Sequence, residues 1–223
     1  KSRTRYCVFS LVKLIMKVKP DIIFAPSPEA STVLFYAAKM SFYRSQIILR
    51  ESNYRSYKDI KKTLRFYLIR YAYKNADKII ALSNGVKLDL INRYGINKEN
   101  IYVVNNPIDF QYVNSQKSKK KNLLNHIKNK KNEEFHIISI GRLVEQKGYD
   151  MLITSFSLLD LDNIYLTILG AGEERENLES QVSRLNIKGK VFIPGYCDNP
   201  YVNMYYSDLF VLSSRWEGLP NVV

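Results

Sequence analysis

Two cations follow the first strand expected in the second half of the chain. In the stretch GRLVEQKG, Gly141 and Arg142 come directly after an apolar run, and Lys147 stands five residues beyond the arginine. A guanidinium fork and an ammonium beside a glycine turn, at or near a helix start, have the chemistry to hold a diphosphate. Two solvated surface cations are the alternative for this pair taken alone.

Glycines and an aromatic residue follow the next two apolar runs. Gly170 and Gly172 form a fragment of the dinucleotide fingerprint GxGxxG, but Arg175 stands where the third glycine should be. A plain strand-to-helix turn with acidic residues in its first turn explains this segment about as well. Gly195 and Tyr196 leave the following strand, and the tyrosine ring either flanks a nucleobase or packs on a neighbouring residue.

A lone carboxylate, Glu217, follows the last apolar run, DLFVL. The residues after Gly218, namely Leu219, Pro220 and Asn221, are expected to open a helix because proline is tolerated in the first helical turn. Free N–H groups at such a helix start attract an anion or a hydroxyl-rich ligand. The alternative is a surface acid at a turn.

The elements that must position these residues alternate along the chain. Short, continuously apolar strands separated by helices are typical of parallel sheets covered on both faces, which bind ligands at the carboxyl ends of the strands. We therefore predict an α/β fold with two Rossmann-like halves. Strands are expected at 21–25, 46–50, 77–83, 101–106, 135–141, 163–169, 190–194 and 208–212, with helices before the first strand and at 28–40, 61–76, 85–95, 148–159, 174–186 and 199–206.

Composition divides the chain into the same halves. We expect one domain at 1–108, an exposed basic connector at 109–133 and a second domain at 134–223. Residues 1–133 contain 27 basic and 9 acidic residues, a net charge of +18, whereas residues 134–223 contain 7 and 12, a net charge of −5. Different partners are expected for the two halves.

Cellular location is inferred from the apolar runs and the cysteines. No apolar run reaches the roughly 18 residues that a membrane-spanning helix needs. Cys7 and Cys197 lie far apart and outside metal-ligand spacing, which favours free thiols in a reducing compartment. We expect a cytoplasmic protein.

Four segments in this order closely resemble the C-terminal, nucleotide-sugar-binding domain of retaining GT-B glycosyltransferases of family 4. They are SIGRLVEQKGYDMLITSF, LTILGAGEERENLE, VFIPGYCDNP and YYSDLFVLSSRWEGLPNVV. Upstream, KPDIIFAPSPEAS and ADKIIALSNGVKLDLINRYGINKENIYVVNNPID resemble the later part of that family's acceptor domain. The resemblance implies a GT-B fold that is truncated at both ends here, so we expect this piece itself to be inactive.

The resemblance also implies roles for individual residues. Arg142 and Lys147 would hold the nucleotide diphosphate and stabilise the charge that grows on it during transfer, so no metal or cofactor is expected. Glu217 would begin the family's Glu-x7-Glu motif, whose second glutamate falls beyond Val223. The other donor-site positions implied are Gly141, Gly172, Gly195, Tyr196, Gly218, Leu219, Pro220 and Asn221.

The implied reaction transfers a hexose or N-acetylhexosamine, with a UDP-sugar favoured, to a glycan or lipid-linked acceptor. Bacterial surface polysaccharides such as capsule or lipopolysaccharide are the expected products. Arg50 and Glu51 match a position where the family often places a histidine or an acidic residue, and Glu51 would orient the acceptor hydroxyl. An ordinary surface ion pair is the alternative.

A cationic aromatic helix, KKTLRFYLIRYAYK, stands at 61–74. It has the composition to rest on an anionic membrane surface, which would make the protein peripheral on the inner face of the plasma membrane. The alternative is that its aromatic stripe belongs to the core.

Three other classes compete with the transferase. A nucleic-acid-binding module would explain the +18 half but not the ordered motifs, and we expect no nucleic-acid partner. A nicotinamide-dependent enzyme would explain the Rossmann pattern but lacks the third glycine. A metal-dependent GT-A transferase would use Asp160-Leu161-Asp162 as its Asp-x-Asp motif, although this triplet precedes a strand instead of ending one.

Overall fold

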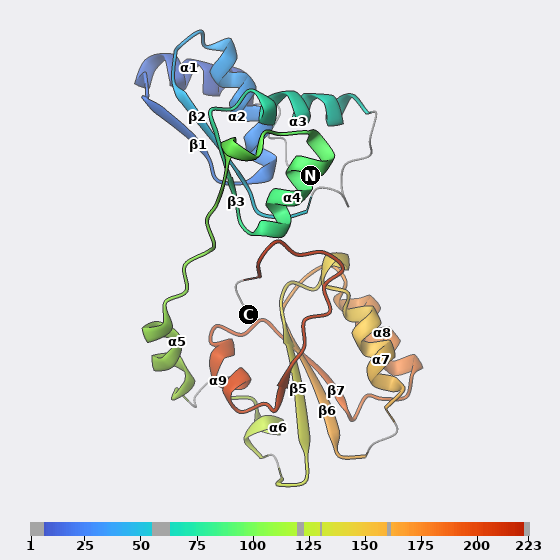
Figure 1. Ribbon diagram of the computed structural model, residues 1–223. Coiled ribbons are helices and arrows are strands. Elements are labelled where there is room, and N and C mark those ends of the chain that lie inside the picture. The colour runs from blue at the N-terminus through green and yellow to red at the C-terminus, as the bar shows by residue number, and fades with distance from the viewer. Residues whose placement is uncertain (1–6, 55–62, 120–122, 130, 160–161, 221–223) are drawn as a thin grey trace. The chain divides into compact units, whose positions relative to one another are not determined.

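The computed structural model describes residues 7–54, 63–119, 123–129, 131–159 and 162–220 (Figure 1). The chain forms two compact units. The first contains the described residues up to Pro107 together with 216–220, and the second contains those from Ile108 to Arg215. The Asp160-Leu161 pair and Asn221 lie outside the described residues.

The first unit is built on one parallel sheet whose strand order, β1-β2-β3-β4, follows the chain. Each of the first three strands is followed by a helix that returns the chain to the start of the next strand. The elements are α1 (Val8–Val18), β1 (Ile22–Ala25), α2 (Pro28–Met40), β2 (Gln46–Glu51), α3 (Leu64–Lys74), β3 (Lys78–Ala81), α4 (Asn84–Tyr94), the 3-10 turn Lys98–Asn100 and β4 (Ile101–Val103).

The core of this unit lies on one face of its sheet. Successive crossovers in one direction place their helices on the same face, because each crossover is right-handed. Alternate strand residues such as Ile47 and Leu49 are therefore buried against the helices. Ile22 and Phe24 on the opposite face are 55% and 46% exposed. The expected coverage of both faces is thus wrong for the described part of this sheet.

The second unit also has a parallel sheet, but its strand order is β7-β6-β5-β8. The chain moves outward from β5 to β7 and then returns to add β8 on the other side of β5. The elements are α5 (Phe110–Lys117), α6 (Asn125–Lys128), β5 (Phe135–Ile140), the 3-10 turn Glu145–Lys147, α7 (Tyr149–Ser157), β6 (Ile164–Leu169), α8 (Arg175–Arg184), β7 (Val191–Gly195), α9 (Pro200–Tyr205) and β8 (Leu209–Phe210).

Both faces of this sheet are covered, as expected. Ile137 of β5 packs in a cluster with α7 and α8, whereas its neighbour Ile138 packs in a second cluster with Met204 of α9. Figure 1 shows α7 and α8 together on one side of the strands. The reversal of direction between β5 and β8 creates a topological switch point, where open α/β sheets bind ligands.

The stretch 109–133, expected as an exposed connector, contributes structure to the second unit. Asp109 caps α5 by accepting a hydrogen bond from the backbone N–H of Tyr112. In the second helix of this stretch, Ile127 is buried with Leu123 against Val202 of α9. Apolar residues spaced between lysines therefore anchor this stretch.

Candidate functional site

The loop predicted to hold the diphosphate, residues 141–148, lies at the carboxyl edge of the second sheet, directly after β5. We call it the diphosphate loop. Its backbone is paired with the loop after β6: the N–H of Gly141 donates to Leu169 O at 2.9 Å, and the N–H of Leu143 donates to Ala171 O at 2.9 Å. A Cβ on Gly170 would collide with Gly141 O, and one on Gly172 would collide with the Leu143 backbone. These glycines therefore permit a close approach of two loops.

Arg142 and Lys147 both lie on this loop. Arg142 is exposed at the strand tip, and Lys147 is half-buried at the end of the 3-10 turn Glu145–Lys147. A Cβ on Gly141 would lie 3.0 Å from Cε of Lys147. The lysine side chain thus passes over the glycine at the strand end, and the two cations border the same small area.

A pocket of about 560 Å³ opens beside this loop. The ends of β5, β6 and β7 and the helices α5 and α9 contribute to its wall. Its lining residues are Tyr112, Ile140, Gly141, Arg142, Leu169, Gly170, Ala171, Tyr196, Cys197, Asp198, Pro200 and Tyr201.

Three tyrosines, Tyr112, Tyr196 and Tyr201, line the pocket together with Arg142. Tyr196 is 76% exposed, so its ring is not packed into the core. Gly195 before it has a φ of 100°, a conformation that favours glycine. Tyr112 and Tyr201 meet edge to face with ring centroids 6.2 Å apart. Sequence reasoning missed this pair, because nothing in the sequence places α5 against α9.

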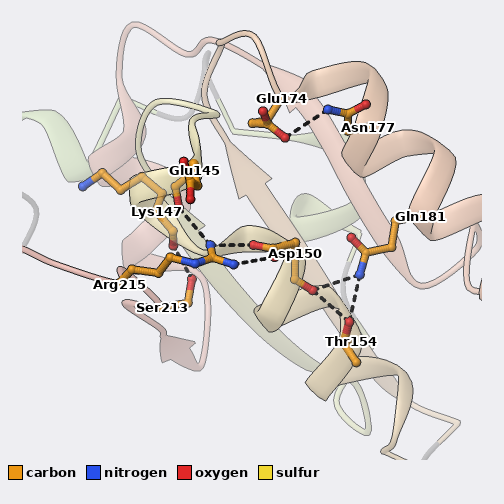
Figure 2. Close-up of polar contacts among 9 residues, drawn as sticks. All are labelled: Glu145, Lys147, Asp150, Thr154, Glu174, Asn177, Gln181, Ser213 and Arg215. Atoms are coloured by element: carbon orange, nitrogen blue, oxygen red, sulfur yellow. Dashed lines mark hydrogen bonds and ion pairs between the residues drawn. The ribbon is translucent and has the colours of Figure 1, made fainter. Parts of the chain in front are cut away.

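The segment after β8 is tied to the diphosphate loop by a network that was not predicted from the sequence (Figure 2). Arg215 forms a two-pronged ion pair with Asp150, at 2.8 Å (Nη1 to Oδ1) and 2.6 Å (Nη2 to Oδ2). The hydrogen bond from Arg215 and its charge hold the pKa of Asp150 below its usual range, and the same pair raises the pKa of Arg215. The sequence shows opposite charges after two of its strands. It does not show that these two strands, β5 and β8, are neighbours in the sheet.

The predicted Glu217 segment is described only in part. Residues 217–220 are half-buried and have no regular secondary structure. No helix begins at Leu219 or Pro220, and Asn221 lies outside the described residues. None of these four is among the described residues that line the pocket.

The predicted acceptor residues have separate partners within the first unit. Glu51 is completely buried and accepts hydrogen bonds from Tyr73 Oη at 2.9 Å and from the backbone N–H of Ser52 at 3.1 Å. Arg50 donates to Asn106 Oδ1 at 2.6 Å. They are not the surface ion pair considered as the alternative. An acceptor hydroxyl would have to compete with these buried hydrogen bonds to reach Glu51.

Within the described residues, no three His, Cys, Asp or Glu side chains are gathered in a way that could hold a metal ion. No helix in the same part of the chain has the length and apolar character needed to cross a membrane.

Comparison with protein families gives two adjoining matches. Residues 1–112 match the family described as Glycosyltransferase Family 4, and residues 120–223 match the family described as Glycosyl transferases group 1.

Two curated relatives have similar sequences. An uncharacterized glycosyltransferase of Methanocaldococcus jannaschii is 30% identical over 96% of this chain and 55% of its own length. The N-acetylgalactosamine-N,N'-diacetylbacillosaminyl-diphospho-undecaprenol 4-alpha-N-acetylgalactosaminyltransferase of Campylobacter jejuni is 31% identical over 70% of this chain and 40% of its own length. The chain thus spans about half the length of the curated relatives it matches.

Among solved structures, HepE of Anabaena in complex with UDP and glucose superposes with a TM-score of 0.78 at 20% identity. The match covers 97% of this chain and 58% of that one. The expected GT-B fold, with two parallel-sheet units, is confirmed.

Proposed function

The chain belongs to glycosyltransferase family 4, and from that premise we propose that the whole protein transfers a hexose or N-acetylhexosamine from a UDP-sugar to a glycan or lipid-linked acceptor. The chain therefore belongs to neither of two competing classes, the nucleic-acid-binding modules and the nicotinamide-dependent enzymes. The proposed products are bacterial surface polysaccharides.

The observation that carries this proposal is the pocket beside the topological switch point of the second unit. Arg142 lines it, and Lys147 lies on the same loop. Glycosyl transfer passes through an oxocarbenium-like state while negative charge accumulates on the departing diphosphate. Two cations at that position stabilise the charge more in the transition state than in the ground state, which accelerates the step.

The same two cations support a reaction without a metal ion. A guanidinium fork matches two phosphate oxygens at once, and an ammonium adds a point charge. Retention of configuration at the sugar carbon is part of the proposal through the family resemblance. Nuclear magnetic resonance of the first product, made from an α-linked donor, tests this directly: an α-linked product is expected, and a β-linked product would contradict retention.

A tyrosine-lined wall supports a nucleoside as part of the donor. The exposed ring of Tyr196 and the Tyr112–Tyr201 pair offer flat apolar surfaces beside the diphosphate loop. Aromatic faces of this kind stack with nucleobases. UDP is the proposed nucleotide because the similar Anabaena protein binds UDP in its solved structure.

We further propose that the acceptor is lipid-linked and that the protein contacts an anionic membrane surface. The name of the Campylobacter relative specifies an acceptor on diphospho-undecaprenol. On α3, Leu64, Tyr67, Leu68 and Tyr71 are exposed at helical spacing, with exposed fractions of 76%, 52%, 41% and 56%. Such a stripe in the basic half of the chain suits a peripheral position on the cytoplasmic face of a membrane.

A nucleotide-sugar panel tests the proposed reaction. The whole protein is incubated with UDP-, GDP- and ADP-linked sugars and an undecaprenyl diphosphate-linked glycan, and release of free nucleotide is measured. We expect acceptor-dependent release of UDP, undiminished by a metal chelator. Release from none of the donors, or release that stops when the chelator is added, would contradict the proposal.

A further inference from the structure

The short segment after β8 holds the backbone of the diphosphate loop at three consecutive carbonyl groups. Arg215 Nη1 donates to Glu145 O at 2.8 Å, the backbone N–H of Arg215 donates to Gln146 O at 2.8 Å, and Ser213 Oγ donates to Lys147 O at 2.8 Å. Each carbonyl of the 3-10 turn that ends at Lys147 is therefore bound to a residue more than 60 positions further along the chain.

The next residue, Gly148, strengthens this attachment. Its φ of 63° lies in the left-handed region, and a Cβ there would collide with Ser213 O. A glycine at this position lets the two segments approach more closely than any other residue would. The contact therefore fixes the point at which the loop turns into α7.

Asp150 in the first turn of α7 orients the Arg215 side chain. The two-pronged pair sets the plane of the guanidinium, so that Nη1 also faces Glu145 O. Asp150 is itself held from the far side, because Gln181 Nε2 donates to its backbone oxygen at 2.9 Å. Figure 2 shows these contacts as one network from α8 to the diphosphate loop.

In Figure 2 the Lys147 side chain extends away from the Arg215 guanidinium. Its Cε instead lies beside the strand end at Gly141. The network thus holds the backbone of Lys147, while its side chain passes Gly141, which lines the pocket. A flexible four-carbon side chain has fewer ways to leave that position when its backbone is fixed.

We propose that Arg215 and Asp150 are positioning residues for the donor diphosphate, acting through the backbone of Glu145–Lys147 and hence through the Lys147 ammonium. This inference rests on the proposed function, because it takes Lys147 as a diphosphate ligand. Neither residue needs to touch the nucleotide.

A double-mutant cycle with UDP as the probe tests the inference. UDP binding to the whole protein is measured by calorimetry for Asp150→Asn, Lys147→Ala and the double variant. We expect Asp150→Asn to weaken UDP binding about fivefold and Lys147→Ala about tenfold or more. The double variant should bind as weakly as Lys147→Ala alone, because Asp150 acts only through the lysine.

Two controls separate positioning from general stability. Arg215→Lys keeps the charge but loses the planar fork, so it should lose about as much UDP affinity as Asp150→Asn. Asp162→Asn removes the partner of a separate exposed ion pair with Lys190 and should leave UDP affinity unchanged. Thermal unfolding of each variant shows whether the protein is still folded.

The outcomes distinguish this inference from the proposed function. Unchanged UDP affinity in Asp150→Asn and Arg215→Lys, beside weakened binding in Lys147→Ala, would overturn the positioning role alone. Losses that add up in the double variant would also overturn it. Unchanged affinity in Lys147→Ala would contradict the donor site itself, and the inference with it.

Discussion

Arg142 and Lys147 are held differently although they lie on one loop. Arg142 is an exposed pocket-lining residue at a strand tip, whereas the lysine backbone is bound to the segment after β8. The arginine fork supplies direction through its own planar geometry. On our proposal the lysine gains its direction from its surroundings, so residues outside the pocket should affect binding at this site.

Removing either cation tests the role of single residues. Arg142→Ala or Lys147→Ala in the whole protein should lower turnover by on the order of a hundredfold or more, since each removes charge from the leaving-group site. Arg184→Ala, an exposed arginine on α8, is the matched control and should leave turnover unchanged. Steady-state release of UDP gives the rates, and normal rates in both test variants would contradict the assignment.

The Asp150–Arg215 pair should make a pH-dependent contribution to stability. The pKa of Asp150 is lowered in the folded state by the guanidinium, while Glu145 and Glu174 act on Arg215 from nearby. The stabilisation is therefore complete above the unfolded pKa of about 3.9 and is lost as pH falls through the lower folded value. The Asp150 side chain is 50% exposed, so solvent screening limits the contribution to about 1 kcal/mol or less.

Urea unfolding of the wild type and Asp150→Asn between pH 7 and pH 2.5 measures this contribution. The difference between the two free energies of unfolding should be largest near pH 7 and should close below about pH 4. A difference that stays constant across this range would show that the carboxylate charge does not stabilise the fold.

At the scale of elements, the strands expected from the sequence all appear, because continuous apolar runs between helices identify buried parallel strands. β8 is shorter than its apolar run and covers only Leu209–Phe210. The helices α5 and α6 were missed because their sequences are mostly polar. Coverage of only one face in the first sheet was also missed, since both faces of β1 carry apolar residues such as Ile23 and Phe24.

The site was predictable where chain order alone brings residues together. Parallel strands end at one edge, so Gly141, Arg142 and Tyr196 were expected there and line one pocket. The Asp150–Arg215 pair depends on β8 lying beside β5, a long-range pairing that local patterns do not encode. The burial of Glu51 likewise depends on Tyr73, a residue of the following helix.

The exposed stripe of α3 predicts binding to anionic bilayers. Part of its aromatic content is core, as the sequence alternative suggested, with Phe66 and Tyr73 buried. Leu64→Ser with Tyr67→Ser should reduce flotation with anionic vesicles severalfold, because both exposed side chains would lose their apolar contact with the bilayer. Leu158→Ser, which replaces a 79% exposed leucine on the second unit, is the control and should have no effect.

Vesicle composition and salt complete that experiment. Neutral vesicles should recover little protein, and raising the salt concentration to 0.5 M should weaken anionic binding because exposed charges are screened. Equal flotation with neutral and anionic vesicles would remove the membrane proposal.

For the whole molecule, the boundary between the units shows where the charge lies. The first unit, residues 1–107 with 216–221, contains 20 basic and 8 acidic residues, a net charge of +12, and the second unit contains 14 and 13, a net charge of +1. The lysine-rich stretch 109–133 belongs to the second unit, where its positive charge offsets the net negative charge of residues 134–223. Nearly all of the net charge of the chain therefore lies in the unit with the proposed membrane contact, while the unit with the proposed donor site is close to neutral.

A crystal structure of the whole protein with UDP would test the central claim most directly. We predict that the diphosphate lies within hydrogen-bonding distance of Arg142 and Lys147 at the carboxyl edge of β5, with the uracil ring in the tyrosine-lined pocket beside Tyr196. UDP bound with its diphosphate away from both cations would contradict the account.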